Sequence, residues 1–234
     1  MTVLDITEVR LEWSDLNRLT YHLRPEMTRS GSEEQHVSHV LKSIAQQQKR
    51  WTKEDELDDM PLRILLGLAF EEAAARLYQR MIWQPGEVEW GGLIGSPDGI
   101  SLVEHPYYTT TPWSTEKPPK DSWVGGRPCV DEFKYSGKSQ RIKGRKPQPD
   151  GNLRSEDLKD IRTEWLWMQQ CQTYINLLRR RFPKEYKNLN LGRFHICWKY
   201  GAYVFPMLEV YYRYLVQFTE EELAGNWAMM QAFK

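Results

Sequence analysis

Hydrophobic positions in the first third of the chain recur at helical spacing. Four aliphatic residues lie three or four positions apart, which predicts an amphipathic helix: Val37, Val40, Leu41 and Ile44. A longer and strongly apolar helix is predicted from Pro61 to Met81, because the fixed φ of proline suits a first helical turn. Pro85 and Gly86 then end the helical pattern. The residues before the first helix, from Val3 onward, predict a short strand followed by a turn.

Strand-like segments follow the second helix. Residues 87–94 and 100–104 are predicted as two strands joined by a turn around 96–99, where Pro and Gly are frequent. Residues 128–135 predict a third strand. Its alternation puts one set of side chains on each face: Val130, Glu132 and Lys134 on one, and Asp131, Phe133 and Tyr135 on the other.

The second half of the chain predicts a helix, two strands and a final helix. The long helix is expected from an N-cap at Ser155 to about Arg181, with strands at 193–200 and 208–218 and a helix at 220–232. The predicted core stripe of the long helix consists of Ile161, Trp165, Met168, Cys171, Ile175 and Leu178. This order of elements predicts a mixed α/β (α+β) fold in one domain, with a central mixed sheet flanked by helices.

Composition narrows the function classes. The 32 basic and 32 acidic residues cancel, so attraction to a polyanion would have to come from local clusters. The three cysteines are far apart and lack CxxC spacing, which argues for a reducing compartment and against zinc or a disulfide scaffold. The five histidines show no ligand pattern, and His36 and His39 are expected at the surface. With no long apolar run, we expect a cytoplasmic protein without membrane contact.

A small set of charged residues suggests phosphodiester chemistry. Asp98 lies in a turn between two predicted strands, and Glu132 and Lys134 share a face of a later strand. Divalent metals held by carboxylates lower the pKa of bound water and polarise phosphoryl oxygens. Lys134 is a candidate to orient or deprotonate the attacking water, with a pKa expected to be lowered by burial near a metal. Taken singly, an ExK triplet is more often a surface ion pair, and a PDG triplet is more often a plain turn.

The combination resembles the PD-(D/E)XK nucleases, and within them the branch of phage lambda exonuclease and RecB. The similarity covers about residues 60–200 and rests on four segments: LGLAFEE at 66–72, GSPDGI at 95–100, DEFK at 131–134 and MQQCQTY at 168–174. A glycine precedes the helix carboxylate by four positions, as Gly67 precedes Glu71, and the later helix carries a QxxxY pattern at Gln170 and Tyr174. The resemblance implies a restriction-endonuclease-like core.

The resemblance also implies a metal site that takes Mg²⁺, with Mn²⁺ as a substitute. The implied ligands are Glu71, Asp98, Glu132 and the backbone carbonyl of Phe133. Glu71 is preferred to Glu72 because it projects from a mainly apolar helix face, where a carboxylate needs a partner. Related nucleases that hold an iron–sulfur cluster need four cysteines, so no cluster is expected here.

Two further groups receive roles through the resemblance. Gln170 and Tyr174 would form a hydrogen-bonding clamp on the ligand or on Lys134, although without the resemblance an ordinary buried polar pair is favoured. A basic run without acids follows the predicted catalytic strand and would contact DNA phosphates: Lys138, Arg141, Lys143, Arg145 and Lys146. Such a run is otherwise usually a solvated loop.

The resulting hypothesis is a phage-type exonuclease that resects linear duplex DNA for recombination. By resemblance it would form a homotrimer and cooperate with a single-strand annealing protein. Residues 1–59 would be a helical segment that approaches DNA, 60–218 the catalytic core and 219–234 a closing helix. The alternatives are a structure- or site-specific endonuclease of the same fold, and a non-catalytic DNA-binding recombination module.

Overall fold

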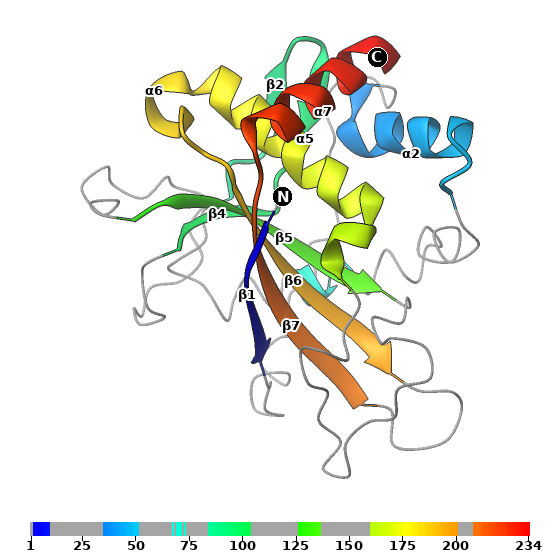
Figure 1. Ribbon diagram of the computed structural model, residues 1–234, viewed down its shortest axis with the longest axis vertical. Coiled ribbons are helices and arrows are strands. Elements are labelled where there is room, and N and C mark those ends of the chain that lie inside the picture. The colour runs from blue at the N-terminus through cyan, green and yellow to red at the C-terminus, as the bar shows by residue number, and fades with distance from the viewer. Residues whose placement is uncertain are drawn as a thin grey trace.

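Strand β5 (Pro128–Ser136) lies inside a five-stranded mixed sheet (Figure 1). The computed structural model describes residues 2–9, 35–51, 67, 69–71, 73, 84–103, 126–136, 160–200 and 208–234. The sheet order is β1–β7–β6–β5–β4, with β1 at Thr2–Val9, β4 at Gly99–Leu102, β6 at Leu191–Tyr200 and β7 at Leu208–Gln217. Only β5 and β6 pair in parallel among these neighbours, and the other pairs are antiparallel. The predicted mixed sheet is therefore confirmed.

Helix α5 (Trp165–Arg181) connects the parallel strands β5 and β6 and lies across one face of the sheet (Figure 1). Its buried residues extend nearly around the helix, because α2 (Val37–Gln47) and α7 (Glu220–Phe233) cover the side turned away from the sheet. The predicted core residues Met168, Cys171, Ile175 and Leu178 are all buried. Gly192 of β6 permits the close approach, since a Cβ at that position would collide with the Cys171 sulfur.

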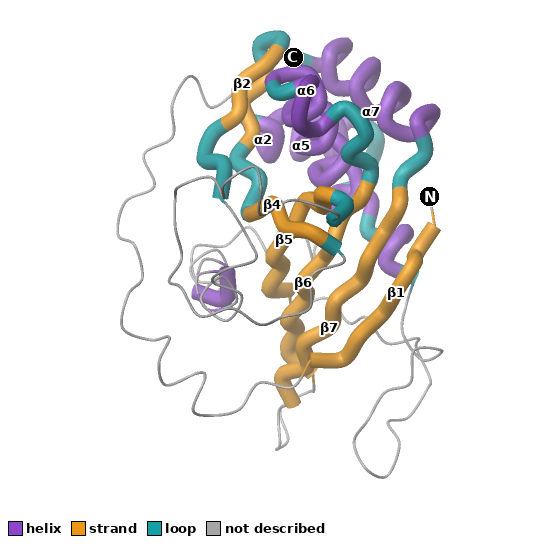
Figure 2. Tube along the Cα trace, turned by 90° about the vertical axis from the view of Figure 1, so that its left-hand side faces the viewer, coloured by secondary structure: helices purple, strands orange, loops and turns teal. Residues whose placement is uncertain are grey.

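Figure 2 shows the helices on this face from a second direction, and polar contacts help to hold them together. Asn226 of α7 (Glu220–Phe233) is buried and hydrogen-bonds Thr173 and Asn176 of α5. A capping box of Thr219 and Glu222 begins α7. Helix α2 (Val37–Gln47) packs its predicted apolar face against α5, and the short helix α6 (Pro183–Tyr186) follows α5. No helix among the described residues is both long and apolar enough to cross a membrane.

One predicted strand proves to be a hairpin. Residues 87–94 were expected to form a single strand, but β2 (Val88–Trp90) and β3 (Leu93–Gly95) pair antiparallel in a separate two-stranded sheet. Gly91 and Gly92 form its turn, with φ of +60° and +77°. Two consecutive residues with positive φ are what a tight hairpin turn requires, and glycine adopts them without strain. The Gly-Gly pair between apolar residues was the overlooked signal.

The long helix also begins later than predicted. Asp160 has an extended conformation, its side chain caps a 3₁₀ turn at Ile161–Thr163, and α5 starts only at Trp165. A helix running from Ser155 through Asp160 is therefore wrong, and Ser155 itself lies outside the described residues. The cause is local: the Asp160 carboxylate accepts a hydrogen bond from the Arg162 N–H, which competes with helix continuation. The predicted strands at 193–200 and 208–218 and the closing helix are confirmed.

Gly95 gives a test of how tightly α5 packs on the hairpin. A Cβ at Gly95 would lie 2.7 Å from Leu177 Cδ1 and 2.8 Å from Tyr174 Cε1. We therefore expect Gly95→Ala to lower the free energy of unfolding by about 1–3 kcal/mol. Gly225→Ala is the matched control, because it lies within α7 with nothing within 4 Å of the added Cβ. It should be neutral or stabilising by up to about 1 kcal/mol. Urea unfolding of both variants is the measurement, and equal effects would contradict this packing.

Candidate functional site

Asp98 is held at the start of β4 by the backbone of β5. The β4–β5 register sets Gly99 opposite Asp131, so the preceding residue, Asp98, lies opposite Glu132 and its side chain reaches the backbone of Phe133. The Phe133 N–H donates a hydrogen bond of 2.7 Å to Asp98 Oδ2. A charge-assisted bond from a strand backbone gives this carboxylate a fixed position. The turn predicted around 96–99 therefore carries Asp98 to the start of the edge strand β4, beside β5.

Glu132 and Lys134 lie on the same face of β5, as the alternation predicted. Lys134 Nζ is 2.7 Å from Glu132 Oε2 and 3.7 Å from Asp98 Oδ2. The Glu132 side chain is fully buried, whereas those of Asp98 and Lys134 are 15% and 13% exposed. The two carboxylates thus share one ammonium, and the cluster reaches solvent only at Asp98 and Lys134.

Burial dominates the electrostatics of the carboxylates. It raises the pKa of Glu132 to about 8, against a smaller opposing effect of Lys134. Burial likewise raises the pKa of Asp98, partly offset by Lys134 and by the Phe133 N–H. For Lys134, burial lowers the pKa, but the charges of Glu132 and Asp98 outweigh it and raise the pKa above its usual value. The lowering of the Lys134 pKa that is expected near a metal stays a prediction, because this raised pKa applies to the protein without metal.

One carboxylate oxygen in the cluster has no partner. Glu132 Oε1 is buried and accepts no hydrogen bond from the described residues. An unsatisfied buried oxygen next to a second carboxylate is costly, and a hard cation would satisfy it. Within the described residues, however, no group of three or more His, Cys, Asp or Glu side chains is gathered in a metal-binding arrangement. Two carboxylates match the sparse protein ligation of Mg²⁺, which retains several waters.

Gln170 and Tyr174 of α5 form the predicted pair beside this cluster. Gln170 Nε2 donates a hydrogen bond of 2.8 Å to the Tyr174 hydroxyl, and Tyr174 is 4% exposed. Burial, followed by the nearby charge of Glu132, raises the pKa of Tyr174. Tyr174 in turn contributes to the raised pKa of Lys134. The pair therefore adjoins the Glu132–Lys134 face, and its proposed role as a clamp stays a prediction.

Glu71 lies in a helical segment that packs against the other face of β5. Its neighbour Phe70 contacts the rings of Phe133 and Tyr135, with centroids 6.3 and 6.5 Å apart. Gln84 Nε2 donates a hydrogen bond of 3.4 Å to Glu71 Oε1. This contact does not join Glu71 to Asp98 or Glu132, so its role as a metal ligand stays a prediction. The basic run from Lys138 to Lys146 lies outside the described residues.

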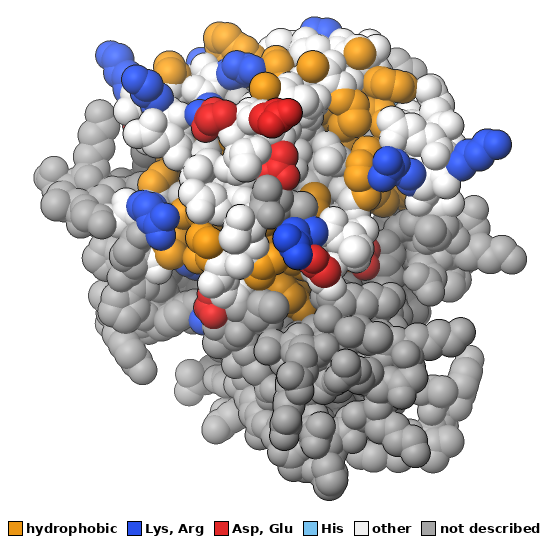
Figure 3. Space-filling model, in the orientation of Figure 1, with side chains coloured by type: hydrophobic (Ala, Val, Ile, Leu, Met, Phe, Trp, Pro, Cys, Tyr) orange, Lys and Arg blue, Asp and Glu red, His pale blue; other side chains and the backbone are white. Residues whose placement is uncertain are grey.

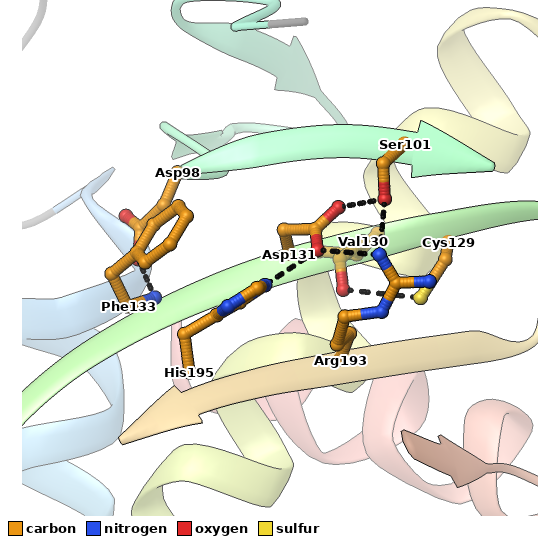
Figure 4. A network of polar contacts seen from close by, with 8 residues as sticks. All are labelled: Asp98, Ser101, Cys129, Val130, Asp131, Phe133, Arg193 and His195. Carbon is orange, nitrogen blue, oxygen red and sulfur yellow. Dashed lines mark hydrogen bonds and ion pairs between the residues drawn. The ribbon is translucent and has the colours of Figure 1, made fainter. Parts of the chain in front are cut away.

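A buried polar network on the Phe133 face was not anticipated from the sequence. It contains Ser101, Asp131, Arg193 and His195 (Figure 4). An acid at Asp131 inside an otherwise apolar strand face was the available signal, since a buried carboxylate needs donors.

The expected surface position of His36 is wrong, because this residue is 4% exposed at the N-terminal end of α2.

Charged side chains of both signs, Lys and Arg as well as Asp and Glu, lie on the face of the molecule shown in Figure 3. This distribution agrees with the zero net charge of the chain. Comparison with known proteins gives no further guide, because no protein-family model and no curated protein matches the sequence.

The raised pKa of Glu132 predicts how stability depends on pH in the absence of metal. The folded-state pKa of about 8 exceeds the ordinary value of 4.5, so this contribution to stability is complete below 4.5 and lost as pH rises through 8. Glu132→Gln imitates the protonated form, so its stability relative to wild type should increase between pH 4.5 and 8.

Urea unfolding in EDTA at about pH 5, 7 and 8.5 measures this difference in the free energy of unfolding, because the difference should change between pH 4.5 and 8. Glu89→Gln is the control, because Glu89 is an exposed carboxylate of the hairpin. Its pH profile should follow that of wild type. A Glu132→Gln profile parallel to wild type would contradict the buried, ionisable state of Glu132.

Proposed function

We propose that this chain is a magnesium-dependent deoxyribonuclease with a restriction-endonuclease-like core. The supporting observation is the cluster of Asp98, Glu132 and Lys134, in which one fully buried and one partly exposed carboxylate flank one ammonium, and in which Glu132 Oε1 has no hydrogen-bond partner among the described residues. A cluster with that composition suits cation binding better than an ordinary ion pair, since two carboxylates face one ammonium and carry an excess of negative charge when all three groups are ionised. The mixed sheet with helices agrees with the proposed core.

The residues that would hold Mg²⁺ or Mn²⁺ are Asp98 and Glu132, with the Phe133 carbonyl and Glu71 as further proposed ligands. A bound cation there would supply an activated water and polarise the phosphate. Lys134 keeps its proton between the two carboxylates, so it is placed to donate a hydrogen bond to a water or phosphate oxygen. The structure thus supports Lys134 as an orienting cation in preference to a base.

The proposed substrate is linear duplex DNA, degraded as by a phage-type exonuclease. The basic run from Lys138 to Lys146 would contact phosphates, and Gln170 with Tyr174 would border the scissile group. A homotrimer and a single-strand annealing partner remain part of this proposal through the resemblance alone. The proposed setting is the cytoplasm of a bacterial host.

Digestion of linear and closed circular duplex DNA tests the proposal. We expect loss of the linear form with Mg²⁺ or Mn²⁺, no turnover with Ca²⁺ because it activates water less well, and none in EDTA. Asp98→Asn, purified in parallel, is the control for contaminating nucleases. Cleavage of the circular form would favour the endonuclease alternative. Full activity in EDTA, or equal activity of Asp98→Asn, would overturn the proposed function.

Substitution of Lys134 separates its two candidate roles. Lys134→Ala should reduce single-turnover cleavage by roughly 10²–10⁴-fold while DNA binding persists. Lys134→Arg should recover about tenfold or more of that loss if a fixed donor is needed, because arginine retains its charge in proteins. An arginine variant as inactive as the alanine variant would instead favour proton transfer by Lys134. Near-wild-type activity of Lys134→Ala would remove Lys134 from the site.

A further inference from the structure

A second polar cluster lies across the sheet from Glu132 and Lys134 (Figure 4). It joins three neighbouring strands through four side chains: Ser101 of β4, Asp131 of β5, and Arg193 and His195 of β6. None is more than 7% exposed. None of these four side chains takes part in the proposed chemistry. Because buried polar groups require hydrogen-bond partners, their presence beside the site calls for an explanation.

The contacts of Asp131 organise the cluster. Its Oδ2 accepts a hydrogen bond from the Ser101 hydroxyl, and its Oδ1 lies 2.8 Å from His195 Nε2 and 3.5 Å from Arg193 NH1. Arg193 NH1 also donates to Ser101 Oγ at 3.1 Å. Burial lowers the pKa of His195 despite the nearby Asp131, so the ring is neutral and donates from Nε2. Arg193 then balances the charge of Asp131.

Phe133 connects this cluster to the candidate metal site. Its ring stacks on His195 with centroids 4.4 Å apart and an interplanar angle of 29°. Its backbone N–H is the group that donates to Asp98 Oδ2 at 2.7 Å. The same residue therefore rests on the polar cluster through its side chain and holds the Asp98 carboxylate through its backbone.

Stability alone is a weak reason for such a cluster. Buried ion pairs recover little net free energy after desolvation, and apolar replacements are often as stable. Directed hydrogen bonds instead restrict the strands that they join to a single geometry. Here they fix β4, β5 and β6 in a single register, and a slip of one residue would turn Glu132 and Lys134 to the opposite face.

We propose that His195 and Asp131 are positioning residues, which fix the Phe133 ring and thereby the N–H that holds Asp98. The significance of Asp98 as a metal ligand rests on the proposed function, whereas the coupling of His195 to the Phe133 N–H does not. Outer residues that orient ligands typically change metal affinity by about 10–100-fold when replaced.

The position of the Phe133 amide can be measured directly by NMR. Labelling with ¹⁵N-phenylalanine gives one amide signal for each of the seven phenylalanines, and Phe133→Leu identifies the signal of Phe133. His195→Gln retains a donor for Asp131 but removes the ring under Phe133. We expect the Phe133 signal to shift and its hydrogen exchange to accelerate on the order of tenfold as the bond to Asp98 weakens.

Asn226→Ala is the matched control, since it disrupts an equally buried polar network between α5 and α7. It should leave the Phe133 amide unchanged. An unchanged amide in His195→Gln, or the same change in both variants, would overturn the positioning role. If His195→Gln does not fold, Ser101→Ala decides by the same criterion, because it removes the hydrogen bond that Ser101 donates to Asp131 and the one that it accepts from Arg193.

A second readout addresses the chemistry. The Mg²⁺ concentration for half-maximal cleavage should rise about tenfold or more in His195→Gln and stay near wild type in Asn226→Ala. Equal Mg²⁺ requirements for His195→Gln and wild type would overturn the link to the metal site. If wild type shows no Mg²⁺-dependent cleavage, the proposed function fails, and the amide measurement still decides whether His195 positions Phe133.

Discussion

The two-residue period of β5 is the constraint on which the site depends. Both faces of the strand are buried, so Glu132 and Phe133 each meet a packed environment on opposite sides of one backbone. Pairing with β4 and β6 leaves no freedom to slide, because any shift by one residue would exchange the two faces. The charged cluster, the Phe133 contact to Asp98 and the polar network all follow from this single register.

The burial of charged groups makes the site energetically unfavourable for the protein alone. Asp98, Glu132 and Lys134 together carry one net negative charge when all are ionised, and one oxygen of Glu132 has no hydrogen-bond partner in the part of the chain that the structure describes. Such an arrangement is unfavourable for the protein alone, as the raised pKa of Glu132 indicates. Functional sites commonly retain this kind of local destabilisation because a ligand relieves it. The stable core on the α5 side makes that cost tolerable.

Local sequence patterns predicted the helices and strands better than the residues at which they begin and end. The two faces of β5 and the core stripe of α5 followed from periodicity, because strand alternation separates the two faces and helical spacing identifies the core positions. The start of α5 did not, since the Asp160 carboxylate captures a nearby N–H that a helix would need. The network around Asp131 and His195 joins residues 64 apart, and no local pattern encodes such a contact. Asp98, Glu132 and Lys134 could be selected from sequence motifs, but the residues that fix their positions could not.

The pattern of exposure indicates the side from which a ligand reaches the cluster. Glu132 is fully buried, so approach must occur past Asp98 and Lys134, the two members that retain exposed surface. Lys134 lies near the end of β5 at Ser136, and the basic run begins two positions later at Lys138. In the sequence, the segment that follows this end of β5 is the most basic run of the chain. In the proposed nuclease, a phosphate attracted by that run would meet the Lys134 ammonium before the fully buried Glu132, which is the order that electrostatic attraction favours.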